Sequence, residues 1–149
     1  MKNNFFVKKN IPILLFIIAA VIQLCALVMY CETGKTEFTP ELSSFVIAFG
    51  SVAMVLGICT ILLKLVSWGK KWVEVGLCVA ALFGLLTFLF YVVNEVNYIA
   101  NILVSIDGTK ISVTFALTAL LYLISWIMML VAAITCKYQT KENCYETEQ

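Results

Sequence analysis

A row of polar side chains follows the third long apolar stretch and holds most of the chemically capable groups of the sequence. Its members are spaced three or four residues apart and so share one face of a helix: Asn94, Asn97, Asn101 and Ser105. Glu95 is the only charged residue between the first and the last of them. A charged side chain at membrane depth is typical of a path for ions or protons. What this stripe can do therefore depends on where the membrane ends relative to Glu95.

A second polar row lies in the fourth apolar stretch, again with helical spacing: Thr114, Thr118, Tyr122 and Ser125. A turn at Asp107 and Gly108 would place the two rows face to face, so that carboxamides could bond hydroxyls across the seam. Two interpretations stay open. The rows hold neighbouring helices together, or they line a path for an ion or a small solute with Glu95 as its charged element.

The elements that position these rows are long apolar stretches. The 149 residues are 62% hydrophobic and 13% charged, whereas a soluble domain carries about a quarter charged residues. About 20 apolar residues are enough to cross a bilayer as a helix. The sequence predicts spans at 11–31, 42–66, 73–95 and 112–136, a polar helical extension at 94–106 and a C-terminal tail at 137–149. We expect an all-α fold in which residues 1–149 form a single membrane domain, an integral four-helix bundle.

The placement of lysine predicts the orientation of the chain. Every basic residue is Lys, and most lie in the head, the second connection and the tail: Lys2, Lys8, Lys9, Lys64, Lys70, Lys71, Lys137 and Lys141. Only Lys35 and Lys110 fall in the first and third connections. Because lysine-rich segments stay on the cytoplasmic side, we expect an up-down-up-down arrangement with both termini in the cytoplasm. The Lys-only, Asn-rich composition favours a bacterial plasma membrane.

Small residues recur at helical spacing in the second and third spans. Gly76, Ala80 and Gly84 follow one another at intervals of four, and Gly50 lies one heptad before Gly57. Such faces let the backbones of two membrane helices approach closely. They are either a dimerisation face or the packing surfaces inside one bundle.

Motifs for catalysis, cofactors and metals are missing from the sequence. It contains no His, no C-x-x-C, no Gly-rich phosphate loop and no hydrolase signature. We expect its six cysteines to be small apolar fillers of helix faces rather than redox sites, with only Cys31 near the outer surface. A net charge of +1 gives no field that would attract nucleic acid. We therefore expect no enzyme, no catalytic or metal site, no cofactor and no nucleic-acid partner, with the lipid bilayer as the surrounding medium.

Two functions are compatible with this pattern. The first is a non-catalytic accessory or interaction subunit that pairs with another membrane protein. The alternative is a homo-oligomeric channel or transporter that uses the stripe from Asn94 to Ser105 with Glu95. Oligomers are needed for the alternative because a single four-helix bundle leaves little room for a water path.

Overall fold

The chain folds into helices that contain its apolar stretches. The computed structural model describes residues 2–34, 41–65, 70–104 and 112–146, with side chains at 11–34, 41–64, 72–100, 102–104 and 112–137. The regular elements within these ranges are all helical: α1 (Lys2–Thr33), α2 (Ser44–Leu65), α3 (Lys70–Asn94), α4 (Val96–Val104) and α5 (Val113–Glu146). Four of them contain segments long and apolar enough to cross a membrane: Ile11–Thr33, Ser44–Lys64, Trp72–Asn94 and Val113–Lys137. The predicted all-α protein with four apolar helices is confirmed.

The two terminal helices are longer than their apolar segments. α1 begins in the basic head at Lys2, and α5 continues past Cys136 to Glu146. The residues that the sequence predicts as a C-terminal tail are thus mostly helical. They contain neither Gly nor Pro and include several Lys, Glu and Gln residues, which favour helix once a preceding turn exists.

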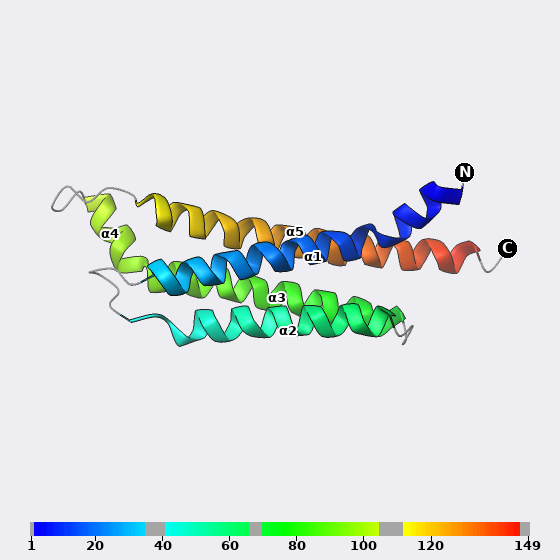
Figure 1. Cartoon of the computed structure of the whole chain (residues 1–149), viewed down its shortest axis with the longest axis horizontal. Coiled ribbons are helices and arrows are strands. Elements are labelled where there is room, and N and C mark those ends of the chain that lie inside the picture. The colour runs from blue at the N-terminus through cyan, green and yellow to red at the C-terminus, as the bar shows by residue number, and fades with distance from the viewer. Residues whose placement is uncertain (1, 35–40, 66–69, 105–111, 147–149) are drawn as a thin grey trace.

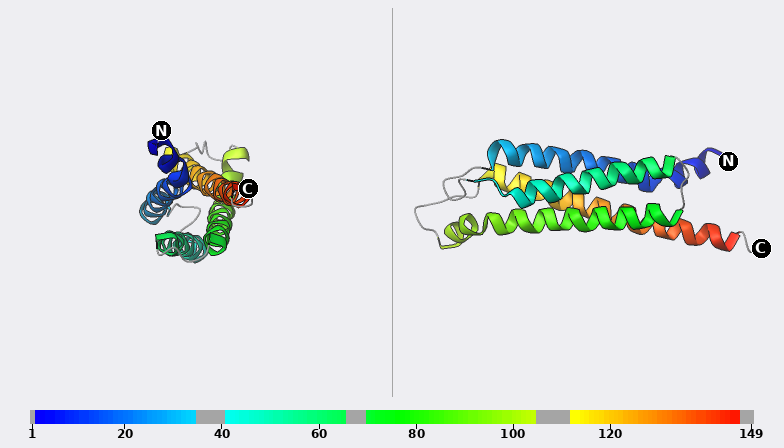
Figure 2. Two further views of the ribbon diagram at one scale, coloured as in Figure 1. Left: turned by 90° about the vertical axis from the view of Figure 1, so that its right-hand side faces the viewer. Right: turned by 90° about the horizontal axis from the view of Figure 1, so that it is seen from below.

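The four long helices lie side by side along one axis (Figure 1). Seen end on, they form a ring in the order α1, α2, α3, α5 (Figure 2). The closest pairs are α2 with α3, α1 with α5 and α3 with α5, whereas α1 and α2 touch over a shorter length. Both chain ends lie at the same end of the molecule, and α4 lies across the opposite end (Figure 1).

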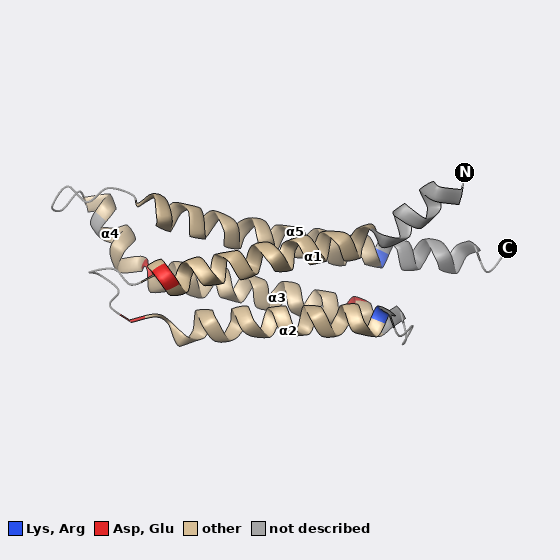
Figure 3. Ribbon diagram, viewed as in Figure 1, with Lys and Arg blue, Asp and Glu red and all other residues tan. Residues whose placement is uncertain are grey.

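Charged side chains separate toward the two ends of the helices (Figure 3). Lys64 lies in the last turn of α2, Glu74 in the first turns of α3 and Lys137 in the second half of α5, so they lie toward the end that holds both chain ends. Glu32 lies in the last turn of α1 and Glu95 directly follows α3, so both lie toward the other end. We call these the lysine end and the acidic end. The middle of the described helices is apolar or uncharged, as hydrocarbon requires.

The interior divides into two clusters with different chemistry. The half toward the lysine end packs mainly small and aliphatic side chains: Phe16, Ala19, Val73, Leu77, Ala80, Ala81, Met129, Ala132, Ala133 and Cys136. The half toward the acidic end is built on aromatic rings: Ala26, Tyr30, Val46, Tyr91 and Tyr122. We refer to them as the lysine half and the acidic half.

Glycines of the two predicted faces contact helices of the same chain. A Cβ at Gly57 would collide with the ring of Phe16 on α1, and one at Gly76 would collide with the Thr60 side chain on α2. At Gly84 it would come 3.2 Å from the sulfur of Met129 on α5. Gly50 faces Leu27 and Thr87. These positions thus serve packing among the four long helices, and Ala80 is buried in the lysine half.

Candidate functional site

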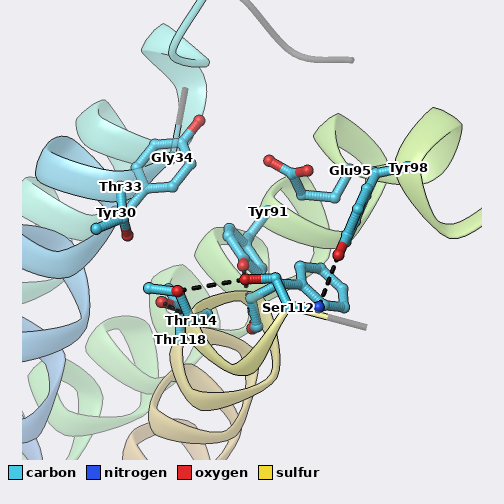
Figure 4. A pocket seen from close by; sticks show the side chains of 10 residues that line it. Tyr30, Thr33, Gly34, Tyr91, Glu95, Tyr98, Ser112, Thr114 and Thr118 are labelled. Atoms are coloured by element: carbon cyan, nitrogen blue, oxygen red, sulfur yellow. Dashed lines mark hydrogen bonds between the residues drawn. The ribbon is translucent and has the colours of Figure 1, made fainter. Parts of the chain in front are cut away.

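A cavity of about 110 Å³ lies at the acidic end, where the last turns of α1 and α3 meet α4 and the start of α5. Its walls combine aromatic rings, hydroxyl groups and one carboxylate: Tyr30, Thr33, Gly34, Tyr91, Glu95, Tyr98, Ser112, Thr114, Phe115 and Thr118. The side chains come from four helices, and they point toward a common space (Figure 4). This volume corresponds to three or four water molecules at about 30 Å³ each.

Glu95 lies at the break between α3 and α4, and it supplies the only carboxylate of the cavity wall among the described residues. A helix running unbroken from Trp72 through Val104 would be about 50 Å long at ~1.5 Å per residue, far beyond a ~30 Å hydrocarbon core. The chain instead turns at Glu95 and α4 crosses the end of the molecule (Figure 1). Glu95 thus lies one residue past the apolar segment Trp72–Asn94, yet it is only 2% exposed.

Two tyrosine hydroxyls hold the starts of neighbouring helices. The hydroxyl of Tyr30 accepts a hydrogen bond from the main-chain N–H of Ser43 at 2.7 Å, and the hydroxyl of Tyr98 accepts one from Ser112 N–H, also at 2.7 Å. Ser43 and Ser112 immediately precede α2 and α5, and their carbonyls accept the first helical bonds. The tyrosines therefore satisfy main-chain donors that helix starts leave open.

The aromatic rings of the cavity pack against one another from different helices. The ring centroids of Tyr30 and Tyr91 are 5.6 Å apart in an edge-to-face arrangement, and Tyr98 meets Phe115 in the same way at 5.3 Å. Tyr91 stacks on Phe115 at 5.9 Å, and its hydroxyl donates to the Phe115 carbonyl at 3.3 Å. These contacts fix the rings as a rigid wall, since such pairs add about 0.5–1.5 kcal/mol beyond their buried area.

The carboxylate of Glu95 is embedded in this aromatic wall. Figure 4 shows the side chain between Tyr30 on one side and Tyr98 on the other. It is close enough to Tyr30 and Tyr91 to interact electrostatically with both phenol groups.

A layer of buried polar groups lies below the cavity, toward the middle of the helices. Gln23 on α1 is fully buried, and neither its amide nitrogen nor its amide oxygen has a hydrogen-bond partner within the described part of the chain. The same holds for the hydroxyl of Tyr122 on α5, whose ring packs on Tyr91 at 5.4 Å. Ser125, one turn further along α5, donates to the Ala19 carbonyl at 2.9 Å.

The predicted polar stripe is divided by the break at Glu95. Asn94 is half-buried and donates to the Tyr30 hydroxyl at 3.3 Å, while Asn97 is exposed. The side chain of Asn101, all of Ser105 and the predicted turn at Asp107 and Gly108 lie outside the described residues. Asn94 and Asn97 therefore lie on different helices, on either side of the break.

The second predicted row forms part of the cavity and of the layer beneath it. Thr114 and Thr118 line the cavity, and Thr118 bonds the Thr114 carbonyl of its own helix at 2.9 Å. The predicted bonds between carboxamides and hydroxyls are not formed by Asn94 or Asn97 with this row. Tyrosine rings and Glu95 face it instead, because the turn at Glu95 directs α4 across the end of α5.

The prediction that cysteines fill buried helix faces is wrong for Cys25, Cys59 and Cys78, which are exposed. Cys31 is exposed as well, and Cys136 is buried. In a membrane this surface faces lipid, where a thiol is as acceptable as in a core. Within the described side chains no cluster of three His, Cys, Asp or Glu residues could hold a metal ion.

Sequence reasoning missed the aromatic part of the site. It did not single out Tyr30, Tyr91, Tyr98, Phe115 or Gln23. One available indication was that buried tyrosine and glutamine in a membrane helix need polar partners.

The chain matches no model of a known protein family, no curated protein and no solved structure.

Proposed function

We propose that this chain is an integral membrane protein whose four apolar helices form an up-down-up-down bundle with both termini in the cytoplasm. The apolar segments are 21 to 25 residues long, enough to cross a bilayer. Both chain ends lie at the lysine end, in agreement with the tendency of lysine-rich segments to stay inside. The acidic end then faces outward, and we keep a bacterial plasma membrane as the proposed location.

Within that membrane we propose a non-catalytic accessory or interaction subunit that binds a small molecule at its outer end. The observation that carries this proposal is the position of the cavity relative to the two halves. The polar cavity lies at the acidic end, whereas the lysine half is filled by packed apolar side chains. A solute that enters from outside meets this packed layer, so the arrangement favours binding over passage.

The alternative is a homo-oligomeric channel or transporter that uses Glu95. One observation favours it: Glu95 is buried near the end of a membrane segment, and buried polar groups continue inward at Thr118 and Tyr122. A path across the membrane would have to run between copies of the chain, because the lysine half of each copy is packed.

A labelling experiment tests the orientation. In a variant whose only cysteine is Cys31, a membrane-impermeant maleimide should label intact cells, since this exposed residue lies near the acidic end. In a variant whose only cysteine is Cys144, labelling should require permeabilised cells. The reverse pattern, or labelling of both in intact cells, contradicts the proposed topology.

A second experiment separates binding from passage. The purified protein, reconstituted in liposomes, should move no small cation or neutral solute above protein-free liposomes, while solubilised protein co-purifies with a membrane partner in mild detergent. Flux that depends on Glu95, lost in Glu95→Gln and retained in Glu32→Gln, would support the channel alternative and reject the accessory role.

A further inference from the structure

We infer that α4 is an interfacial helix, which lies along the outer lipid–water boundary with one apolar face in the bilayer. This α4 apolar face is defined by its exposed members: Val96, Ala100, Leu103 and Val104. The partner of the face is the bilayer itself. The inference goes beyond the proposed binding role and rests on the proposed orientation, in which the acidic end faces outward.

The side chains of α4 fall on three sides of the helix. Successive residues of an α-helix turn by about 100°, so the members of the α4 apolar face lie together and Tyr98 lies on the opposite side. The three large members of the face are 53 to 78% exposed, whereas Tyr98 is 6% exposed. Asn97 is exposed at the edge between these two sides. Separate apolar, polar and protein-facing sides are typical of a helix that lies flat in a membrane interface.

The side of α4 that faces the bundle is fixed by Tyr98. Its ring meets Phe115 of α5 edge-to-face with the centroids 5.3 Å apart, and its hydroxyl accepts a hydrogen bond from Ser112 N–H at 2.7 Å. Turning the α4 apolar face toward the bundle would break both contacts. Because the hydrophobic effect disfavours leaving this face in water, its cover must come from outside the described chain.

The position of α4 indicates that this cover is lipid. Seen end on, α4 lies at the rim of the ring beside α5, not over its middle (Figure 2). Exposed apolar side chains continue on the neighbouring helices, with Val93 64% exposed near the end of α3 and Val113 81% exposed at the start of α5. The α4 apolar face thus extends the apolar outer surface of the long helices, which faces lipid in the proposed topology.

The composition of α4 specifies the kind of lipid contact. Residues 96–104 include no charged side chain. Interfacial helices bind through their buried apolar area and, where they are basic, through attraction to anionic headgroups. Only the first contribution is available to α4. Its contact should therefore be with the boundary between headgroups and acyl chains, and it should not depend on the charge of the headgroups.

The test measures which medium surrounds each side of α4 in the full chain, reconstituted in phosphatidylcholine vesicles. A cysteine-free background receives one substitution at a time, Leu103→Cys, Asn97→Cys or Leu82→Cys, and each cysteine is labelled with an environment-sensitive fluorophore. Leu82 is the matched control, because it is 57% exposed near the middle of the third apolar segment. The quenchers are iodide on both sides of the membrane and lipids with a nitroxide at a shallow or a deep position of the acyl chain.

The expected pattern follows from the three sides of the helix. The shallow nitroxide lipid should quench the Leu103→Cys label at least about threefold more than iodide does, because the α4 apolar face lies just below the headgroups. The order should be reversed for the Asn97→Cys label, which faces water. The deep nitroxide lipid should quench the Leu82→Cys label most. Vesicles of phosphatidylglycerol should give the same pattern, and far-UV circular dichroism confirms that each variant folds.

Contrary outcomes overturn the inference separately from the proposed function. If iodide quenches the Leu103→Cys label as strongly as the Asn97→Cys label, the α4 apolar face lies in water. If that label is shielded from iodide and lipid alike, protein covers the face, as a second copy would. Lipid quenching that requires phosphatidylglycerol would contradict a contact independent of headgroup charge. In all three cases the spans stand while the deep nitroxide quenches the Leu82→Cys label. If iodide quenches it instead, the proposed membrane protein is rejected as well.

Discussion

The lysine half and the acidic half fill the space between the same four helices with different kinds of side chain. In the lysine half, alanines and glycines bring the helices close, and large residues such as Phe16 fit against glycine on the neighbouring helix. In the acidic half, tyrosines from separate helices meet at ring edges and leave a cavity. Closely packed backbones leave a filled core in the lysine half, whereas the bulky tyrosine rings of the acidic half leave a cavity between them.

The two halves also differ in how their buried polar side chains are hydrogen-bonded. In the lysine half the Thr60 hydroxyl bonds a carbonyl of its own helix at 2.7 Å. At the inner edge of the acidic half, Gln23 and Tyr122 keep buried polar atoms without a partner in the described chain, whereas toward the lysine end one carboxylate oxygen of Glu74 does so. Lipid supplies no compensating water, so such atoms lower stability unless a ligand or water reaches them. The acidic half thus gives up stability where it provides a polar interior.

Among the substitutions that test this contrast, Gly57→Leu has the largest expected effect on stability. The new side chain would collide with Phe16 and force α1 away from α2, so we expect the unfolding free energy to fall by about 3 kcal/mol. Ala48→Leu, at an exposed position of the same helix, should change it by less than about 0.5 kcal/mol. Denaturation in mixed micelles measures both, and equal effects would mean that the lysine half is not tightly packed.

Two alanine substitutions on α3 test the packing of the lysine half more finely. At Gly76 the added Cβ would collide with Thr60, whose side chain is held by its bond to Leu56, and we expect a loss of about 2 kcal/mol. At Gly84 it would meet the flexible end of Met129 at 3.2 Å. Alanine also favours helix over glycine by about 1 kcal/mol, so the net change should be near zero. A reversed order would contradict the packing described.

Gln23→Leu should raise stability by about 1 kcal/mol. The substitution replaces a buried amide that lacks partners within the described chain by an apolar group of similar size. The same micelle titration measures the change. A loss of stability instead would show that the amide is bonded, through water or a bound ligand, in the folded protein.

The smallest effects concern two hydroxyls one turn apart on α5. Ser125→Ala removes a bond to α1 and should cost about 0.6 kcal/mol, the average for such bonds in membranes. Tyr122→Phe removes a hydroxyl that has no partner in the described chain, so stability should stay the same or rise slightly. The double variant should be measured as well, because Tyr122 and Ser125 are neighbours and the effects of neighbouring substitutions need not add.

The four apolar helices could be predicted from the sequence because hydropathy and length are local properties. The polar helical extension after the third span was also predicted, whereas the break at Glu95 that separates it from α3 was not. The cavity was not predictable in the same way. Tyr30, Tyr91, Tyr98 and Phe115 come from four helices, and their meeting depends on axial register and on the direction of α4. Neither is encoded in the periodicity of a single segment.

The turn at Glu95 also sets the bilayer thickness that suits the protein. It limits the third apolar segment to 23 residues, beside 23, 21 and 25 in the others, or about 30 to 40 Å at ~1.5 Å per residue. All four segments therefore match one hydrocarbon thickness with modest tilt. A thinner or thicker membrane would strain the corner between α3 and α4 first, because a buried carboxylate there tolerates contact with acyl chains least.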